Sequence, residues 1–349
     1  MQQESEVIQR EASEHTLTGD LTQLAQESEA AQRDAPRSTL FERITRLPAI
    51  ISKVPSTVKT MRRMGPDEKR YLPPPRAYEL PEYREGMQYC TSKEKYLRPR
   101  RLTNPRDHNV VALANELGAY ELPDREFAEA AFWWVKTNLW WELGKWRGVG
   151  NVLAVGRGNC WNFNNVLVAL CRCAGIKSRF KAFKMVMWQS AAEELQEYDQ
   201  GLTLGSGKPL PEAEPEIFID GTWEPAYVAQ NSRMSAAAGF PVCELGESGA
   251  GLYFDVVPGS TQFLETVPLQ MAYAPTLMGI FIPATVERIN VAVMEAQENG
   301  RKDIEKVGGL EAYNRIARKR RASFSPDEIM ELMREERAAQ VQIKKPEQS

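Results

Sequence analysis

The stretch that decides the fold is residues 156–175, GRGNCWNFNNVLVALCRCAG. Glycines and an asparagine precede Cys160 and suit a tight turn. Apolar residues then recur at spacings of three and four, which predicts a helix with one buried face: Phe163, Val166, Leu167, Leu170 and Cys171. Gly175 is typical of a helix C-cap. We therefore expect Cys160 at the N-terminus of a buried helix, where free N–H groups and the helix dipole lower a thiol pKa and favour a nucleophile.

Length and composition limit the classes of protein to which the chain can belong. The 349 residues are 42% hydrophobic, enough for one large domain with appendages or two smaller domains. The net charge of −3 gives no sign of a polyanion, so we expect no nucleic-acid partner. Five cysteines are an odd number and do not make a complete disulfide framework. With no apolar signal segment and no apolar run of about 20 residues, we expect a soluble cytoplasmic protein, and no cofactor is indicated.

The chain divides into four predicted parts. Residues 1–40 are polar and predict a disordered or loosely helical arm. Residues 41–106 form a basic, proline-rich wrapping segment, residues 107–266 the core, and residues 267–349 a helical C-terminal extension. No clear linker separates the extension from the core, so we expect the two to pack together.

Two basic stretches raise the question of a charged partner. Residues 40–64 combine apolar spacing with six Lys or Arg residues, which suits a membrane-surface or partner-docking segment. We favour a basic arm on the protein's own surface, because Pro48 and Pro55 interrupt a continuous helix. For the basic residues 316–321, IARKRR, we favour a solvated helix face over a site that binds an anion or nucleic acid.

Helical patterns fill the first half of the core. A short helix near Val110 is closed by Gly118, and Asp124 is expected to cap a second helix. The buried stripe of the second helix is predicted from its spacing: Phe127, Ala130, Ala131, Trp134 and Val135. Six of the eight tryptophans lie between residues 133 and 161. Large aromatic side chains mostly pack, so we favour a core role for them over a substrate groove.

Strand patterns follow the Cys160 helix. Alternation after Gly175 predicts a strand, and the polar, Gly-rich residues 189–211 predict a surface insertion. Residues 216–219 and 223–228 then predict a β-hairpin with its turn at Asp220 and Gly221.

This order of elements, with these residues, resembles the transglutaminase-like superfamily, whose fold is related to papain. The specific parts are GNCWNF at 158–163, LCRCAGIKSRF at 170–180 and EIFIDGTW at 216–223. The resemblance implies an α+β core, in which a central Cys-bearing helix packs on an antiparallel sheet, and amide hydrolysis or acyl transfer by Cys, His and Asp. It places Cys160 at the nucleophile position. For a substrate bound at this position, the candidate contacts are four tryptophans: Trp161, Trp140, Trp141 and Trp223.

The chain departs from the family pattern at the partners of Cys160. The family's His lies nine residues before the glycine of the Asp-Gly turn, and Glu212 stands there. The acid that orients the His is replaced by Ala226 or Tyr227, and the chain's two histidines, His15 and His108, lie elsewhere. A carboxylate is a weak base with an ordinary pKa of about 4.3, and when ionised it raises a neighbouring thiol pKa.

Two hypotheses of different classes follow. The first is a catalytically degenerate scaffold that binds a protein or peptide partner. The second is a cysteine-dependent peptidase, amidase or acyltransferase in which Glu212, Glu214 or Glu216 replaces the missing base. A third class is a redox or metal role for Cys171 and Cys173. We favour the simpler interpretation that they are two small residues packed at the end of a buried helix.

Overall fold

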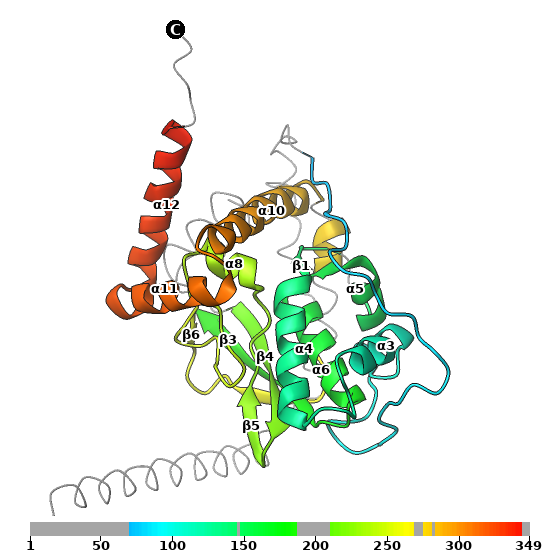
Figure 1. Cartoon of the computed structure of the whole chain (residues 1–349). Helices are drawn as coiled ribbons and strands as arrows, with labels where there is room; N and C mark the ends of the chain where they lie inside the picture. Colours follow the sequence, from blue (N-terminus) through cyan, green and yellow to red (C-terminus); the bar gives the residue numbers. More distant parts are fainter. Residues whose placement is uncertain (1–69, 145–146, 187–209, 269–274, 281–282, 344–349) are drawn as a thin grey trace, which may run out of the picture. The chain divides into compact units, whose positions relative to one another are not determined.

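The structure is a computed structural model that describes residues 70–144, 147–186, 210–268, 275–280 and 283–343, with only the backbone for 339–343 (Figure 1). The chain divides into two units, Met1–Ser56 and Thr57–Ser349, and every described residue belongs to the second. The arm at 1–40, the segment at 40–64 and residues 189–209 of the expected insertion lie outside the described residues. The four-part domain division therefore stays a prediction.

Four helices build the first half of the core: α3 (His108–Glu116), α4 (Asp124–Asn138), α5 (Val149–Val155) and α6 (Cys160–Cys173). Helix α6 is central, because α3, α4, α5 and the sheet all contact it. Its apolar residues at 163, 166, 167, 170 and 171 are fully buried, as their spacing predicts. The expected C-cap region is also present, with Gly175 at φ 85°. The helix predicted around Cys160 is thus confirmed.

The second helix corrects the predicted stripe. Helix α4 buries Phe127, Ala131 and Val135 as expected, but it also buries Ala128, Phe132 and Lys136, while Ala130 and Trp134 are only partly buried. The reason is that α4 packs on both α6 and α8 (Ser232–Ala237), so two faces are covered instead of one. The helix begins at Asp124 itself, after Pro123, and no side chain caps it.

An antiparallel sheet of strand order β5-β4-β3-β6, with β7 also paired to β3, covers the other side of α6. Its strands are β3 (Ser178–Val186), β4 (Leu210–Ile219), β5 (Thr222–Pro225), β6 (Asp255–Val256) and β7 (Gln262–Leu264). The fold is therefore α+β and transglutaminase-like, as the sequence predicts. A short parallel pair, β1 (Trp140–Trp141) and β2 (Arg157–Gly158), leads into α6.

The hairpin β4–β5 is displaced from its predicted bounds. β4 begins at Leu210, inside the stretch expected to be a surface insertion, and β5 ends at Pro225 instead of residue 228. The sequence pattern predicts the strand only from Glu216 onward. Residues 210–215, which pair with β3, extend the strand, and their glutamates at 212 and 214 are buried.

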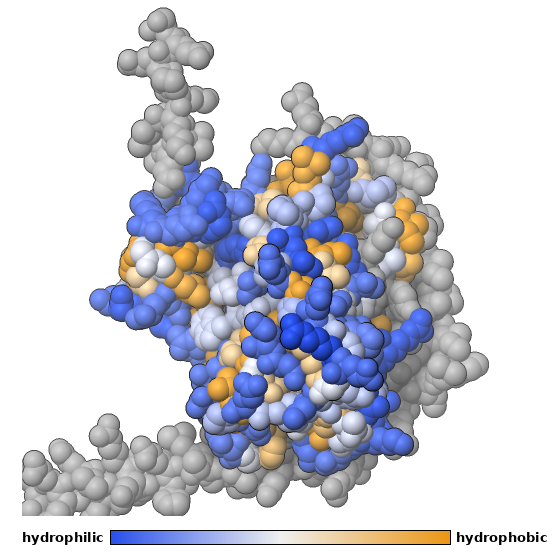
Figure 2. Space-filling model, turned by 45° about the vertical axis from the view of Figure 1, so that its right-hand side comes forward, coloured by the Kyte–Doolittle hydropathy of each residue, from blue (hydrophilic) through white to orange (hydrophobic). Residues whose placement is uncertain are grey.

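Three long helices follow the sheet: α10 (Pro283–Lys306), α11 (Leu310–Ser323) and α12 (Pro326–Ile343). Helix α10 runs close to α8, where a Cβ on Gly300 would lie 1.9 Å from the backbone oxygen of Arg233. Tyr313 of α11 and Met333 of α12 bury their side chains in two apolar clusters that include residues 236–243. Hydrophobic residues form small, separate patches among hydrophilic ones on the face drawn in Figure 2. No helix in the described part of the chain is long and apolar enough to cross a bilayer.

Candidate functional site

Cys160 is the first residue of α6, and the local sequence fixes it there. Asn159 is the N-cap, and it exchanges hydrogen bonds of 3.1 Å with Asn162 in a capping box. Gly158 is required because a Cβ at that position would lie 2.7 Å from the Asn162 side chain. The turn therefore presents Cys160, which is partly exposed, at the open end of a buried helix.

Glu212 lies close to Cys160. The carboxyl and the Cys160 thiol are near enough to shift each other's pKa, and one carboxyl oxygen accepts a 2.8 Å bond from the N–H of Ala213. Burial raises the pKa of Glu212 to about 7, although the Ala213 N–H and the Cys160 thiol act in the opposite direction. The structure thus brings together the two residues that the sequence placed at the nucleophile and base positions.

The environment of Glu212 differs from that of the next two glutamates on β4. Glu214 and Glu216 lie opposite Lys181 and Arg179 of β3, with N–O distances of 3.0 and 2.7 Å. Phe183 lies opposite Glu212, so β3 supplies no cation at this position. Burial raises the pKa of Glu212 with no facing cation to oppose it, and burial also raises the pKa of Glu216, although Arg179 acts in the opposite direction.

The thiol of Cys160 is held in its protonated form. Burial raises its pKa well above the ordinary value, and the charge of Glu212 raises it further. The backbone N–H groups of Trp161 and Cys160 lower the pKa but do not prevail. The expectation that the helix N-terminus lowers the pKa of Cys160 is therefore corrected: the dipole acts in that direction, and burial together with Glu212 outweighs it.

Tyr227 is, with Ala226, one of the two residues at the expected position of the family's acid. Its ring is buried, and its pKa is raised by burial, then by Glu212 and Cys160. Close by, the ammonium of Lys136 lies 5.5 Å from the Tyr227 ring centroid and donates a 2.9 Å hydrogen bond to the backbone oxygen of Gln230. Burial lowers the pKa of Lys136 to about 8. The phenol carries no charge with which to orient a base as an aspartate would.

Lys136 was missed by the sequence-based prediction. It lies four residues after Phe132 on the second buried face of α4. A prediction that allowed this helix two buried faces would have included it. Its charge hid this position, because lysine is almost never fully buried.

The four tryptophans expected to bind substrate do not share one site. Trp161 adjoins Cys160 and packs in the core against Phe180, and Trp141 is paired with Gly158. The Trp140 ring lies under the guanidinium of Arg233, 3.8 Å from its carbon.

Trp223 is a correction to the predicted set. It pairs with Phe218, six residues along β4 from Glu212, which is roughly 20 Å of strand. There its ring packs on Arg179 at 4.1 Å. Trp223 therefore lies apart from Cys160, because the hairpin extends away from the base position.

Other candidate groups lie apart from Cys160. The imidazole of His108 stacks on Tyr83 with ring centroids 4.1 Å apart, and His15 falls outside the described residues. Within the described ranges no three His, Cys, Asp or Glu side chains group together as metal ligands do.

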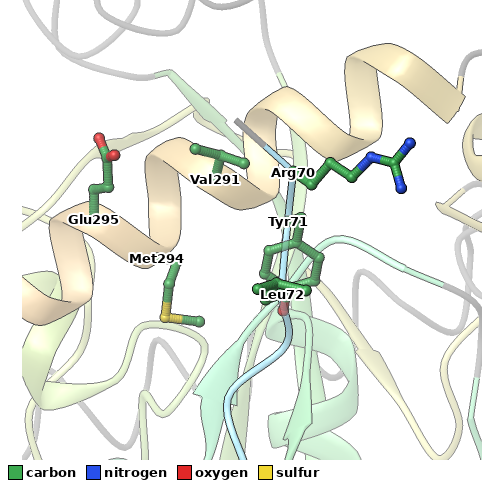
Figure 3. Close-up of a pocket in the computed structure, with 6 residues that line it drawn as sticks. All are labelled: Arg70, Tyr71, Leu72, Val291, Met294 and Glu295. Atoms are coloured by element: carbon green, nitrogen blue, oxygen red, sulfur yellow. The ribbon is translucent and has the colours of Figure 1, made fainter. Parts of the chain in front are cut away.

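Two adjoining cavities lie beside α10. The larger, of about 390 Å³, is lined by Arg70, Tyr71, Leu72, Val291, Met294 and Glu295. Figure 3 shows residues 70–72 running past α10, from which the other three side chains project. The smaller cavity, of about 260 Å³, shares Tyr71, whose hydroxyl donates a 2.8 Å hydrogen bond to Glu142. Neither lining includes Cys160 or Glu212.

Comparison with protein families agrees with this geometry. Residues 111–189, from α3 into the residues after β3, match the family model of the transglutaminase-like superfamily. Over these residues the chain is similar to the transglutaminase-like superfamily. Among solved structures, it is similar to a "putative cysteine protease" from Cytophaga hutchinsonii, with 16% identity and a TM-score of 0.30. The match covers 48% of this chain and 50% of that one, so the chain spans about half the length of that protein. No curated protein sequence matches the chain.

In this transglutaminase-like core, Cys160 keeps the turn, the helix end and the two backbone N–H groups that suit a nucleophile. Glu212 stands at the expected base position, and Ala226 and Tyr227 stand at the expected acid position. The site therefore consists of one thiol, one carboxyl with a pKa of about 7 and one neutral phenol.

Proposed function

We propose that this transglutaminase-like core is catalytically degenerate and binds a protein or peptide partner instead of cleaving one. The observation that supports the proposal is that the residue at the base position, Glu212, is a buried carboxyl that raises the pKa of the Cys160 thiol. An imidazole at this position becomes a cation and stabilises a thiolate. Glu212 becomes an anion and destabilises it.

The consequence for reactivity follows from the thiolate fraction. The ordinary pKa of this thiol is 9.0, and at Cys160 it is raised well above that value. At pH 7 such a thiol is less than about 1% ionised. Forming the thiolate beside an ionised Glu212 would also place two negative charges in contact at a buried site, which is costly.

A second function is favoured by one feature of the same site. Glu212 has a pKa of about 7, which suits a general base at neutral pH. In this alternative Glu212 takes the thiol proton as the Cys160 sulfur attacks an amide carbonyl, and returns it to the leaving amine. The backbone N–H of Cys160 would face the developing oxyanion.

Alkylation kinetics of Cys160 test the proposal. The full-length protein is treated with iodoacetamide from pH 6 to pH 10, and modification of each cysteine is followed by peptide mass spectrometry. For a degenerate site, Cys160 reacts at pH 7 no faster than glutathione. Glu212→His should increase its rate at least tenfold, because an imidazolium stabilises the thiolate, and the matched Glu212→Gln should increase it much less.

Two results would overturn the degenerate assignment. One is an apparent pKa below about 7.5 at Cys160 in the wild-type protein. The other is a covalent acyl adduct on Cys160 after incubation with peptide amides, absent in Glu212→Gln. The binding half is tested with Cys160→Ala: a peptide ligand that binds wild type and variant equally supports binding without chemistry.

A further inference from the structure

Cys90 and Cys173 lie side by side, outside the candidate site. We propose that they form a redox-active pair that closes reversibly to an intramolecular disulfide. The sequence drew attention to Cys171 and Cys173 as a C-x-C motif. In the structure these two residues are two positions apart on α6, about 200° around the helix, so they do not face each other. Cys173 instead adjoins Cys90.

The backbone sets the distance between the pair. The N–H of Cys90 donates a 2.8 Å hydrogen bond to the carbonyl oxygen of Cys173. With about 1.5 Å from N to Cα and about 2.4 Å from a carbonyl oxygen to its own Cα, the two Cα atoms lie at most about 6.7 Å apart. Disulfides span Cα distances of about 4.4 to 6.8 Å, so the backbone separation permits the bond.

The two thiols share a neighbour, which shows that their side chains gather in one place. The Tyr120 hydroxyl donates a 2.7 Å hydrogen bond to the Cys173 carbonyl oxygen. Burial raises the pKa of this phenol most, and both thiols raise it further. Burial also raises the pKa of Cys173, and the Cys90 thiol adds to that effect.

The residues around Cys90 are held on both sides. The Asn115 side chain accepts a 3.3 Å hydrogen bond from the N–H of Gln88 and donates a 2.9 Å bond to its carbonyl oxygen. The Arg106 guanidinium donates a 2.7 Å bond to the carbonyl oxygen of Thr91. Cys90 is therefore positioned against α6 before any disulfide forms.

Exposure sets the order of events with glutathione disulfide as the oxidant. Cys90 is partly exposed, whereas Cys173 is fully buried. The Cys90 thiolate attacks one sulfur of glutathione disulfide and releases one glutathione thiolate. Cys173 then loses its proton to solvent, and its sulfur displaces the second glutathione from Cys90. Two protons and two electrons leave the protein, and one glutathione disulfide becomes two glutathione molecules.

The bond would join the extended chain before α3 to the C-terminal end of the helix that carries Cys160. It closes a loop of roughly 80 residues, a length at which disulfides stabilise strongly by restricting the unfolded chain. Oxidation should therefore add a covalent link between this segment and the core, to which hydrogen bonds hold residues 88–91 while the cysteines are free.

The experiment uses the full-length chain, equilibrated with glutathione disulfide and then alkylated under denaturing conditions. We expect the mass before alkylation to fall by about 2 Da, two fewer alkylated cysteines, and one peptide pair linking Cys90 to Cys173. The thermal midpoint should rise by about 5 to 10 °C on oxidation. Cys90→Ser and Cys173→Ala should lose all three effects, while Cys171→Ala and Cys243→Ala should retain them.

Two outcomes would overturn the proposal. One is a Cys90–glutathione mixed disulfide that persists at pH 9 without release of the second glutathione. The other is a disulfide linking any other pair of the five cysteines, or between two chains. Because Cys90 is partly exposed, Cys90→Ser should leave the unfolding midpoint of the reduced protein nearly unchanged, which separates loss of the disulfide from loss of the fold.

Discussion

Glu212 should make the stability of this protein depend on pH, and Glu212→Gln should remove that dependence. Burial raises the pKa of Glu212 from 4.5 to about 7 in the folded chain. The folded state thus binds this proton more tightly than the unfolded state. Its contribution to the free energy of unfolding is complete below pH 4.5 and is lost as the pH rises through about 7.

The magnitude follows from the size of the shift. A difference of about 2.5 pKa units corresponds to about 3 kcal/mol, of which about 2.5 kcal/mol falls between pH 5 and pH 8. The glutamine side chain has nearly the same shape without the titration, so any pH-independent cost of the substitution cancels in the comparison. The free energy of unfolding of Glu212→Gln, relative to wild type, should therefore increase by about 2.5 kcal/mol from pH 5 to pH 8.

Urea unfolding measures this difference. The full-length protein, Glu212→Gln and Cys160→Ala are unfolded under reducing conditions at pH 5, 6, 7 and 8 and followed by tryptophan fluorescence. Cys160→Ala is the matched control, because it removes the thiol and keeps Glu212, and it should retain the wild-type pH dependence. A difference between Glu212→Gln and wild type that stays constant within about 0.5 kcal/mol across this range would refute a buried, protonated Glu212.

Three further predictions concern residues around the site. Lys136→Met should stabilise the protein by about 2 kcal/mol in urea at pH 7 and by less at pH 9, because burial lowers the pKa of this ammonium to about 8 and keeping it charged costs stability below that pH. Gly158→Ala should cost about 2 kcal/mol in thermal unfolding, because its Cβ would displace Asn162 from the capping box; no loss would show that the turn can adapt. Arg179→Met should cost about 3 kcal/mol by leaving Glu216 buried without its cation, and adding Glu216→Met should recover most of the loss; an equally unstable double variant would contradict this origin.

The fold around Cys160 was predictable because its signals are local. Apolar residues at helical spacing, Asn159 before the helix and Gly175 after it specify α6 without knowledge of its neighbours. The Asp220–Gly221 turn specifies the hairpin in the same way, with both residues at positive φ. The second buried face of α4 could not be predicted in this way. It is buried because α4 packs on both α6 and α8, and the sequence of α4 gives no information about where those helices lie.

The electrostatics of the site were less predictable, because they depend on pairing across the sheet. The sequence identified Glu212 as the replacement for the base, yet its environment is set by Phe183 opposite it on β3. Glu214 and Glu216 resemble Glu212 in sequence, but they face Lys181 and Arg179, and Glu214 also accepts hydrogen bonds from Ser248 and Gly249. Strand register, which sequence spacing leaves open, therefore decides which of these carboxyls faces a cation.

The two departures from the family pattern are consistent with each other. In a Cys-His-Asp site, the aspartate stabilises the imidazolium that forms during the reaction. With Glu212 in place of the imidazole, an aspartate at position 227 would add a second buried anion beside a carboxyl, and such like-charged pairs are strongly disfavoured. Tyr227 avoids this conflict, because burial keeps its phenol neutral. The site is therefore electrostatically stable as a thiol, a carboxyl and a phenol. Restoring an imidazole at position 212 alone would raise thiol reactivity but leave that imidazole without a carboxylate to orient it.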